Sequence, residues 1–137
     1  MNAEQIALVQ SSFAKVEPIS EQAAAIFYDR LFELAPQVRA LFTGDMKLQG
    51  RKLMAMLRTV TIKLNDLDNL VPAVQQLAVR HVAYGAQPAH YAVVGQALID
   101  TLDKGLGEDF TPAVREAWLT AYALLSGVMI EAAAQPA

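Results

Sequence analysis

The sequence predicts one all-helical domain, and three observations carry that prediction. Apolar residues recur at helical spacing from one end of the chain to the other, and no stretch alternates as a half-buried strand would. Proline and glycine interrupt this spacing at regular points, as they do between helices. The length of 137 residues suits a single domain with a buried core. We therefore expect about six to eight helices with short connections.

The first half of the chain predicts three helices and a short helical segment. Asn2 can cap the first helix with Gln5 as its capping-box partner, and Pro18 ends it. The second helix begins at Ser20, and the short segment runs from Pro36 to residues 41–42. A turn at residues 43–45 follows. The long third helix comes next and is broken at residues 65–69. The residues expected on the inner faces are Ile6, Val9, Phe13, Val16, Ala24, Phe27, Tyr28, Leu31, Phe32, Gln49, Leu53, Met56, Val60 and Leu64.

The second half predicts three more helices. The first carries an inner stripe that leads to His81 and ends at Gly85, and the second runs from Pro88 to the glycines at 105 and 107. The last begins at Thr111-Pro112, a cap followed by proline at the first helical position. We expect a single domain over residues 1–137 with its core at about 3–130, and a frayed tail at residues 131–137.

Composition and charge exclude several classes of protein. The formal net charge is −3 and the pI is about 5.3, which argues against nucleic acid and anionic membranes as main partners. The chain has no cysteine, which excludes disulfides, cysteine-bound zinc and iron–sulfur clusters. Residues 1–5 do not begin a signal peptide, and the longest apolar stretch, residues 121–130, is too short to span a bilayer. We expect a cytoplasmic protein.

His81 is the main candidate for chemistry. It falls on the same helical stripe as Leu70, Val74 and Leu77, so its imidazole faces the core and needs a partner there. Two interpretations remain open from spacing alone. The imidazole can be a core histidine bonded to a backbone carbonyl, or it can be an axial ligand of a haem iron.

Two further polar side chains stand on apolar stripes. Gln49 leads the stripe of the long third helix, and Tyr28 lies between Phe27 and Phe32. Taken alone, each has an ordinary explanation. Gln49 can be a helix-end glutamine that reaches solvent, and Tyr28 can be a core tyrosine with a bonded hydroxyl.

Other constellations are weak. His81 and His90 are the only histidines, and their separation is not a usual zinc spacing. No serine, histidine and carboxylate pattern suggests a hydrolase. The glycines at 105 and 107 end a helix and lack the strand that a phosphate-binding loop would follow. We therefore assign no catalytic residue.

Taken together, the polar and aromatic positions resemble a known family. The positions that carry the resemblance are, in chain order, Tyr28, Leu41-Phe42, Gln49, Arg51-Lys52-Leu53, Arg80-His81, His90-Tyr91, Val94-Gly95, Ala117-Trp118 and Ala121-Tyr122. In order and spacing they are similar to the bacterial single-domain haemoglobins and to the globin domain of flavohaemoglobins. The resemblance covers about residues 3 to 130 and implies a globin fold around a haem pocket.

The resemblance also implies a role for each matching residue. The implied roles are His81 as proximal ligand of the haem iron, Phe42 against the porphyrin, Tyr28 and Gln49 as the distal pair facing bound gas, Leu53 as their apolar neighbour, and Tyr91 in a proximal hydrogen-bond network. An apolar pocket of Phe27, Phe42, Leu53, Val60, Leu77 and Val94 would hold the haem by burial. Lys52, Arg80 or Arg51 would pair with the haem propionates, unless they are solvated surface charges.

One position departs from the family pattern. In the family a glutamate on the last helix completes the proximal network, whereas Ala133 occupies the matching position here and Glu131 is the nearest acid. A proximal histidine without that carboxylate pushes less strongly on the iron. This would suit reversible gas binding better than cleavage of bound peroxide.

The resemblance implies reversible binding of dioxygen, or of CO or NO, at a pentacoordinate haem b iron, for oxygen binding, transport or storage. The same pocket would serve a nitric oxide dioxygenase, which needs electrons. The 137 residues leave no room for a flavin domain, so a separate reductase would be a partner. A haem-based gas sensor, and a haemless interaction protein in which His81 is structural, remain alternatives. We expect a monomer or a weak homodimer.

Overall fold

The computed structural model describes residues 1–134, apart from the side chain of Pro88, and this part is helical almost throughout. It contains no strand within those residues, so the prediction of an all-helical domain is confirmed. The α-helices are α1 (Ala3–Val16), α2 (Ser20–Leu34), α3 (Met46–Ile62), α4 (Leu67–Ala83), α5 (Pro88–Leu106) and α6 (Pro112–Ala134). The 3-10 helices are η1 (Glu17–Ile19), η2 (Pro36–Leu41), η3 (Lys63–Asn65) and η4 (Gly107–Asp109).

The helix boundaries follow the residues that predict them. The side chain of Asn2 accepts a hydrogen bond from the Gln5 amide at 2.8 Å, and the Gln5 side chain accepts one from the Asn2 amide at 3.2 Å. Asp45 caps α3 through the Lys47 amide. Helix α6 runs to Ala134, so residues 131–134, expected to fray, continue the helix, and residues 135–137 lie outside the described part.

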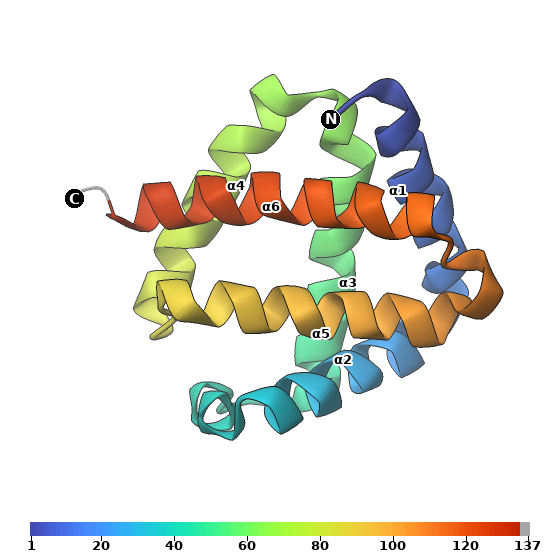
Figure 1. The fold of residues 1–137 in the computed structure, drawn as a ribbon. Coiled ribbons are helices and arrows are strands. Elements are labelled where there is room, and N and C mark those ends of the chain that lie inside the picture. Colours follow the sequence, from blue (N-terminus) through green and yellow to red (C-terminus); the bar gives the residue numbers. More distant parts are fainter. Residues whose placement is uncertain (135–137) are drawn as a thin grey trace.

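The helices pack in crossed pairs. Figure 1 shows α5 and α6 running side by side across the front, with α3 crossing behind them. Helix α6 packs on α1, α4 and α5, and α2 packs on α3 and α5. Two glycines make the closest crossings: a Cβ on Gly50 would lie 2.9 Å from the Cβ of Ala24, and a Cβ on Gly95 would lie 2.7 Å from the Tyr122 ring.

Helices α3 and α4 diverge from the short η3 that joins them (Figure 1). Helix α3 packs mainly on α1 and α2, whereas α4 packs mainly on α6. The two helices therefore do not pack closely along each other. The fold therefore leaves the space between these two helices to be filled by side chains or by a bound group.

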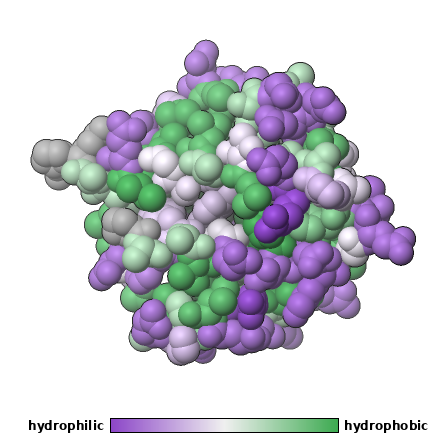
Figure 2. Space-filling view, in the orientation of Figure 1, coloured by the Kyte–Doolittle hydropathy of each residue, from purple (hydrophilic) through white to green (hydrophobic). Residues whose placement is uncertain are grey.

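Helix α6 is the most apolar element. By length and composition it could cross a membrane, which the sequence analysis did not expect, but the core helix of a globular protein passes the same test. Its Trp118 is buried and donates from Nε1 to Ser12 Oγ on α1 at 2.8 Å. Figure 2 shows hydrophobic and hydrophilic patches interspersed on the face that carries α5 and α6. The Trp118 bond and the packing on α1, α4 and α5 place one face of α6 in the core.

Candidate functional site

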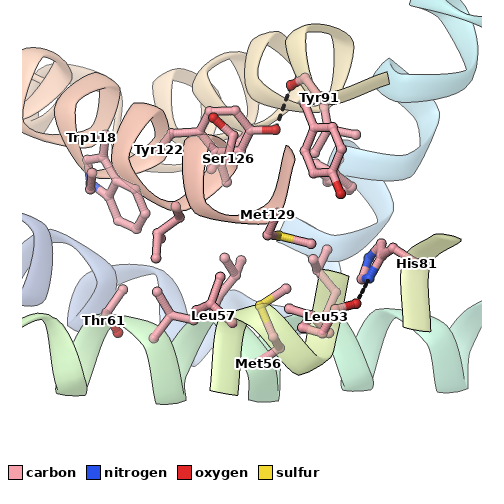
Figure 3. A pocket seen from close by; sticks show the side chains of 18 of the residues that line it. Leu53, Met56, Leu57, Thr61, His81, Tyr91, Trp118, Tyr122, Ser126 and Met129 are labelled. Carbon is pink, nitrogen blue, oxygen red and sulfur yellow. Dashed lines mark hydrogen bonds between the residues drawn. The ribbon is translucent and has the colours of Figure 1, made fainter. Parts of the chain in front are cut away.

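An apolar cavity of about 160 Å³ lies between α3, α4, α5 and α6 (Figure 3). Its walls include five of the six residues that the sequence predicts for the haem pocket: Phe27, Leu53, Val60, Leu77 and Val94. The sixth, Phe42, is half-buried against Tyr28 and Phe32 and does not line the cavity. Sequence reasoning did not place Met129 of α6 in the wall, because its position depends on how α6 crosses the other helices.

His81 faces this cavity from the last turn of α4. Its Nδ1 atom lies 2.8 Å from the carbonyl oxygen of Leu77. A carbonyl oxygen can only accept, so Nδ1 carries the proton and donates it, which leaves Nε2 deprotonated in the neutral ring. The two interpretations of His81 are therefore compatible: one nitrogen satisfies a backbone carbonyl, and the other is available to a metal.

Tyr91 lies on the same side of the cavity as His81. Its ring points from α5 toward the His81 side of the pocket (Figure 3), and burial raises its pKa. Its backbone carbonyl accepts a hydrogen bond from the hydroxyl of Tyr122 on α6, whose ring lies against Gly95. Burial, and then the nearby Tyr91, raise the pKa of Tyr122. Tyr122 thus joins α6 to the start of α5, a role that its spacing did not reveal.

The end of α6 brings no carboxylate to this network. Ala133 is half-buried and Glu131 is exposed. Among the described residues, His81 donates its hydrogen bond to the Leu77 carbonyl and not to a carboxylate.

One of the two predicted distal residues, Tyr28, belongs to an aromatic cluster. The ring of Tyr28 lies 5.3 Å from that of Phe42 and 6.0 Å from that of Phe32, measured between centroids. Burial raises the pKa of Tyr28, and the polar side chain of Gln49 opposes this in part. Tyr28 borders a groove between α2 and α3 instead of the cavity that His81 lines. Leu53, one turn beyond Gln49 on α3, does line that cavity, whereas neither Tyr28 nor Gln49 does.

The predicted propionate partners lie on the surface. Arg51 forms an exposed ion pair with Glu21 on α2 at 3.9 Å, and Lys52 and Arg80 are exposed. Within residues 1–134, no ion pair involves Lys52 or Arg80. None of the three lines the cavity.

The chemistry of the site fits a haem. The described residues contain no group of three or more His, Cys, Asp or Glu that could hold a bare metal ion. His81, whose Nδ1 is held by Leu77 at an apolar cavity, could hold a haem iron through Nε2. The walls are apolar and include residues of both α3 and α4. Its volume resembles that of a cavity that holds one benzene-sized molecule, about 150 Å³. The side chains that line the cavity would therefore have to move apart to admit a porphyrin.

Comparisons with known proteins agree with this geometry. The family model described as Globin matches residues 25–129. A flavohemoprotein of Vibrio cholerae is 30% identical over 134 residues, covering 96% of this chain and 34% of that protein. A flavohemoprotein of Pseudomonas putida is 32% identical over 136 residues, covering 96% of this chain and 35% of that protein. The chain thus spans about a third of the length of these relatives.

A solved structure matches over nearly the whole fold. It is that of an engineered carbene transferase from Rhodothermus marinus, provisionally described as a nitric oxide dioxygenase. The two are 27% identical with a TM-score of 0.88, and the match covers 98% of this chain and 94% of the other. The fold, the cavity faced by His81 and the family match lead to one conclusion: this chain belongs to the globin family.

Proposed function

We propose that the chain holds haem b through Nε2 of His81 and reversibly binds dioxygen, or another diatomic gas such as CO or NO, for oxygen binding, transport or storage. The observation that carries this proposal is the orientation of His81, whose Nδ1 is held by Leu77 while the ring faces an apolar cavity. When bound, haem supplies the iron on which the gas binds. The fold class and the family match support a haem-based gas-binding role.

The residues around His81 favour reversible binding. The Leu77 carbonyl fixes the ring and makes Nε2 a better donor to iron, but it pushes less strongly than a carboxylate would. Glu131 is exposed and does not add a carboxylate. The apolar walls hold the porphyrin by burial and keep water from the gas.

On the other side, Tyr28 and Gln49 provide hydrogen-bond donors. Dioxygen bound to a haem iron would carry partial negative charge, and a hydrogen bond to a charged group contributes about 1.5–3 kcal/mol. Since about 1.4 kcal/mol corresponds to tenfold in affinity, one donor slows dioxygen loss roughly tenfold to a hundredfold. For this the Tyr28 hydroxyl would have to turn from its groove toward the cavity at Leu53.

The relatives favour a second candidate, nitric oxide dioxygenase. Two are named flavohemoproteins, and the matched solved structure is provisionally described as a nitric oxide dioxygenase. Sustained oxidation of nitric oxide needs electrons after each turnover. A reductase would have to supply them, and the region matched here is about a third of the length of those relatives.

Two rate measurements on the haem-loaded protein separate the candidates. One is dioxygen release by stopped-flow, and the other is nitric oxide consumption with NADH and a flavin reductase. Fast dioxygen release with no sustained nitric oxide consumption supports the carrier. Many turnovers of nitric oxide per haem support the dioxygenase, and a protein that binds no gas at all contradicts both.

A further inference from the structure

His90 stands at the third residue of α5 and lines the same cavity as His81. The backbone N–H of Gln87, the residue before α5, donates to Nδ1 of His90 at 3.0 Å. The backbone N–H of His90 in turn donates to the Gln87 carbonyl at 2.9 Å. The imidazole of His90 is therefore held at the helix start through one nitrogen only.

This hydrogen bond assigns the tautomer of His90. Because Nδ1 accepts from a backbone N–H, it carries no proton, and the proton of the neutral ring is on Nε2. Nε2 is then a donor on the opposite edge of the ring. Among the described residues, the hydrogen bonds of His90 include none at Nε2.

Most other polar side chains of the cavity wall already use their donors. The partners are Leu77 O for His81 Nδ1, Arg58 O for the Thr61 hydroxyl, Ser12 Oγ for Trp118 Nε1, Tyr91 O for the Tyr122 hydroxyl and Ala123 O for the Ser126 hydroxyl. The donors that remain in the wall are the Tyr91 hydroxyl and Nε2 of His90. Tyr91 points toward the side of His81, whereas His90 stands at the half-buried beginning of α5.

We propose that Nε2–H of His90 donates a hydrogen bond to a propionate of the haem, an inference that rests on the proposed function. Haem is apolar except at its propionate edge, so it needs a polar partner at the rim of an apolar pocket. A hydrogen bond from a neutral donor to a carboxylate is stronger than a hydrogen bond between two neutral groups. The positive end of the α5 helix dipole also favours a carboxylate at this place. His90 takes the place that the sequence predicted for Arg51, Lys52 or Arg80, none of which lines the cavity.

Two variants separate the nitrogens of His90. In His90→Asn the side-chain oxygen can replace Nδ1 as acceptor for Gln87, but nothing replaces Nε2. In His90→Gln the longer amide reaches the Nε2 position and can still donate. The measurement is the rate of hemin loss to an excess of an apoglobin acceptor. We expect about tenfold faster loss for His90→Asn and a rate close to wild type for His90→Gln.

A second arm changes the cofactor instead of the protein. Hemin with both propionates methylated presents no carboxylate. With this hemin, the rate of loss from His90→Asn divided by the rate from wild type should therefore fall toward one. If this ratio of loss rates is the same with both hemins, the effect belongs to the helix cap and the proposal is overturned. Equal rates of loss of ordinary hemin from wild type and His90→Asn would also overturn it. If circular dichroism shows that His90→Asn is unfolded, the rate of hemin loss from His90→Gln is measured with both hemins instead. A rate that depends on propionate methylation as in wild type supports the proposal. A rate that does not depend on methylation overturns it.

Failure of the proposed function can be distinguished from failure of the His90–propionate contact. If wild type takes up no hemin, or if His81→Ala holds it equally well, the function and this inference both fall. If wild type holds hemin through His81 and His90→Asn loses it no faster, only the propionate contact falls.

Discussion

Nδ1 of His81 and the carbonyl oxygen of Leu77 lie 2.8 Å apart, one turn from each other on α4. This single contact satisfies a polar group on an apolar face and turns Nε2 into the available nitrogen. A ring held in this way loses little freedom when it binds a metal. The bond therefore joins the local structure of α4 to the chemistry of the cavity.

Tyr28→Phe should speed dioxygen release roughly tenfold to a hundredfold, because it removes the hydroxyl that stabilises the charged gas. CO gains much less charge, so its release should change little. Stopped-flow release of both gases from the haem-loaded variant measures this. Tyr91→Phe is the matched control, because its hydroxyl lies on the His81 side. Equal acceleration of both gases by Tyr28→Phe would count against the distal role.

Gly95→Ala should destabilise the fold by about 1–3 kcal/mol. A Cβ there would lie 2.7 Å from the Tyr122 ring, so the ring must shift and its bond to the Tyr91 carbonyl weakens. Gly127→Ala is the control: nothing lies within 4 Å of its Cβ, and it should stabilise α6 by about 0.5–1 kcal/mol. Urea unfolding measures both, and a Gly95→Ala variant as stable as Gly127→Ala would contradict the crossing geometry.

Ser12→Ala should lower the free energy of unfolding by about 1–3 kcal/mol, because it leaves the buried Nε1–H of Trp118 without an acceptor. The neighbouring Ser11→Ala is the matched control. Ser11 is exposed, so its loss should change stability by less than about 0.5 kcal/mol. Unfolding followed by tryptophan fluorescence compares the two, and equal stability would show that the Trp118 contact adds nothing.

Stability should fall as the pH rises above about 10, the pKa of a tyrosine in an unfolded chain. The folded chain raises the pKa values of Tyr28, Tyr91 and Tyr122, so the unfolded chain loses these protons first. The stabilisation is complete below about pH 10 and is lost as the pH approaches the folded values. Tyr122→Phe should flatten this decline relative to wild type.

Urea unfolding at several alkaline pH values measures the decline. Tyr84→Phe, whose ring is 62% exposed, is the control for the loss of a hydroxyl. If Tyr122→Phe and wild type decline with the same slope, the buried phenol of Tyr122 does not contribute to it.

The sequence predicts what local patterns encode. The period of 3.6 residues places Leu70, Val74, Leu77 and His81 on one stripe, and the prolines at 36, 88 and 112 mark where helices begin. These features need only neighbours along the chain. The helical class and most helix boundaries could therefore be predicted without the structure.

The remainder depends on how the helices cross. The contact of Gly95 with Tyr122, and the pairing of Arg51 with Glu21, each join elements that are distant in sequence. The turn of Tyr28 toward a groove depends on the α2–α3 approach at Gly50. A pattern within one helix carries no information on these angles. The hydrogen bond between Gln87 and His90 does have a local signal, because the two residues are three positions apart at the start of α5. The spacing of the two histidines, considered only as a zinc site, could not reveal it.

The most direct test of the account is the absorption spectrum of the protein after addition of hemin, in the ferrous form with and without CO. The account predicts a Soret band that shifts on addition of CO. In His81→Ala the band should be lost or depend on added imidazole, which can replace the missing ligand. A wild-type protein that is folded by circular dichroism yet stays colourless, or a His81→Ala spectrum identical to wild type, would contradict it.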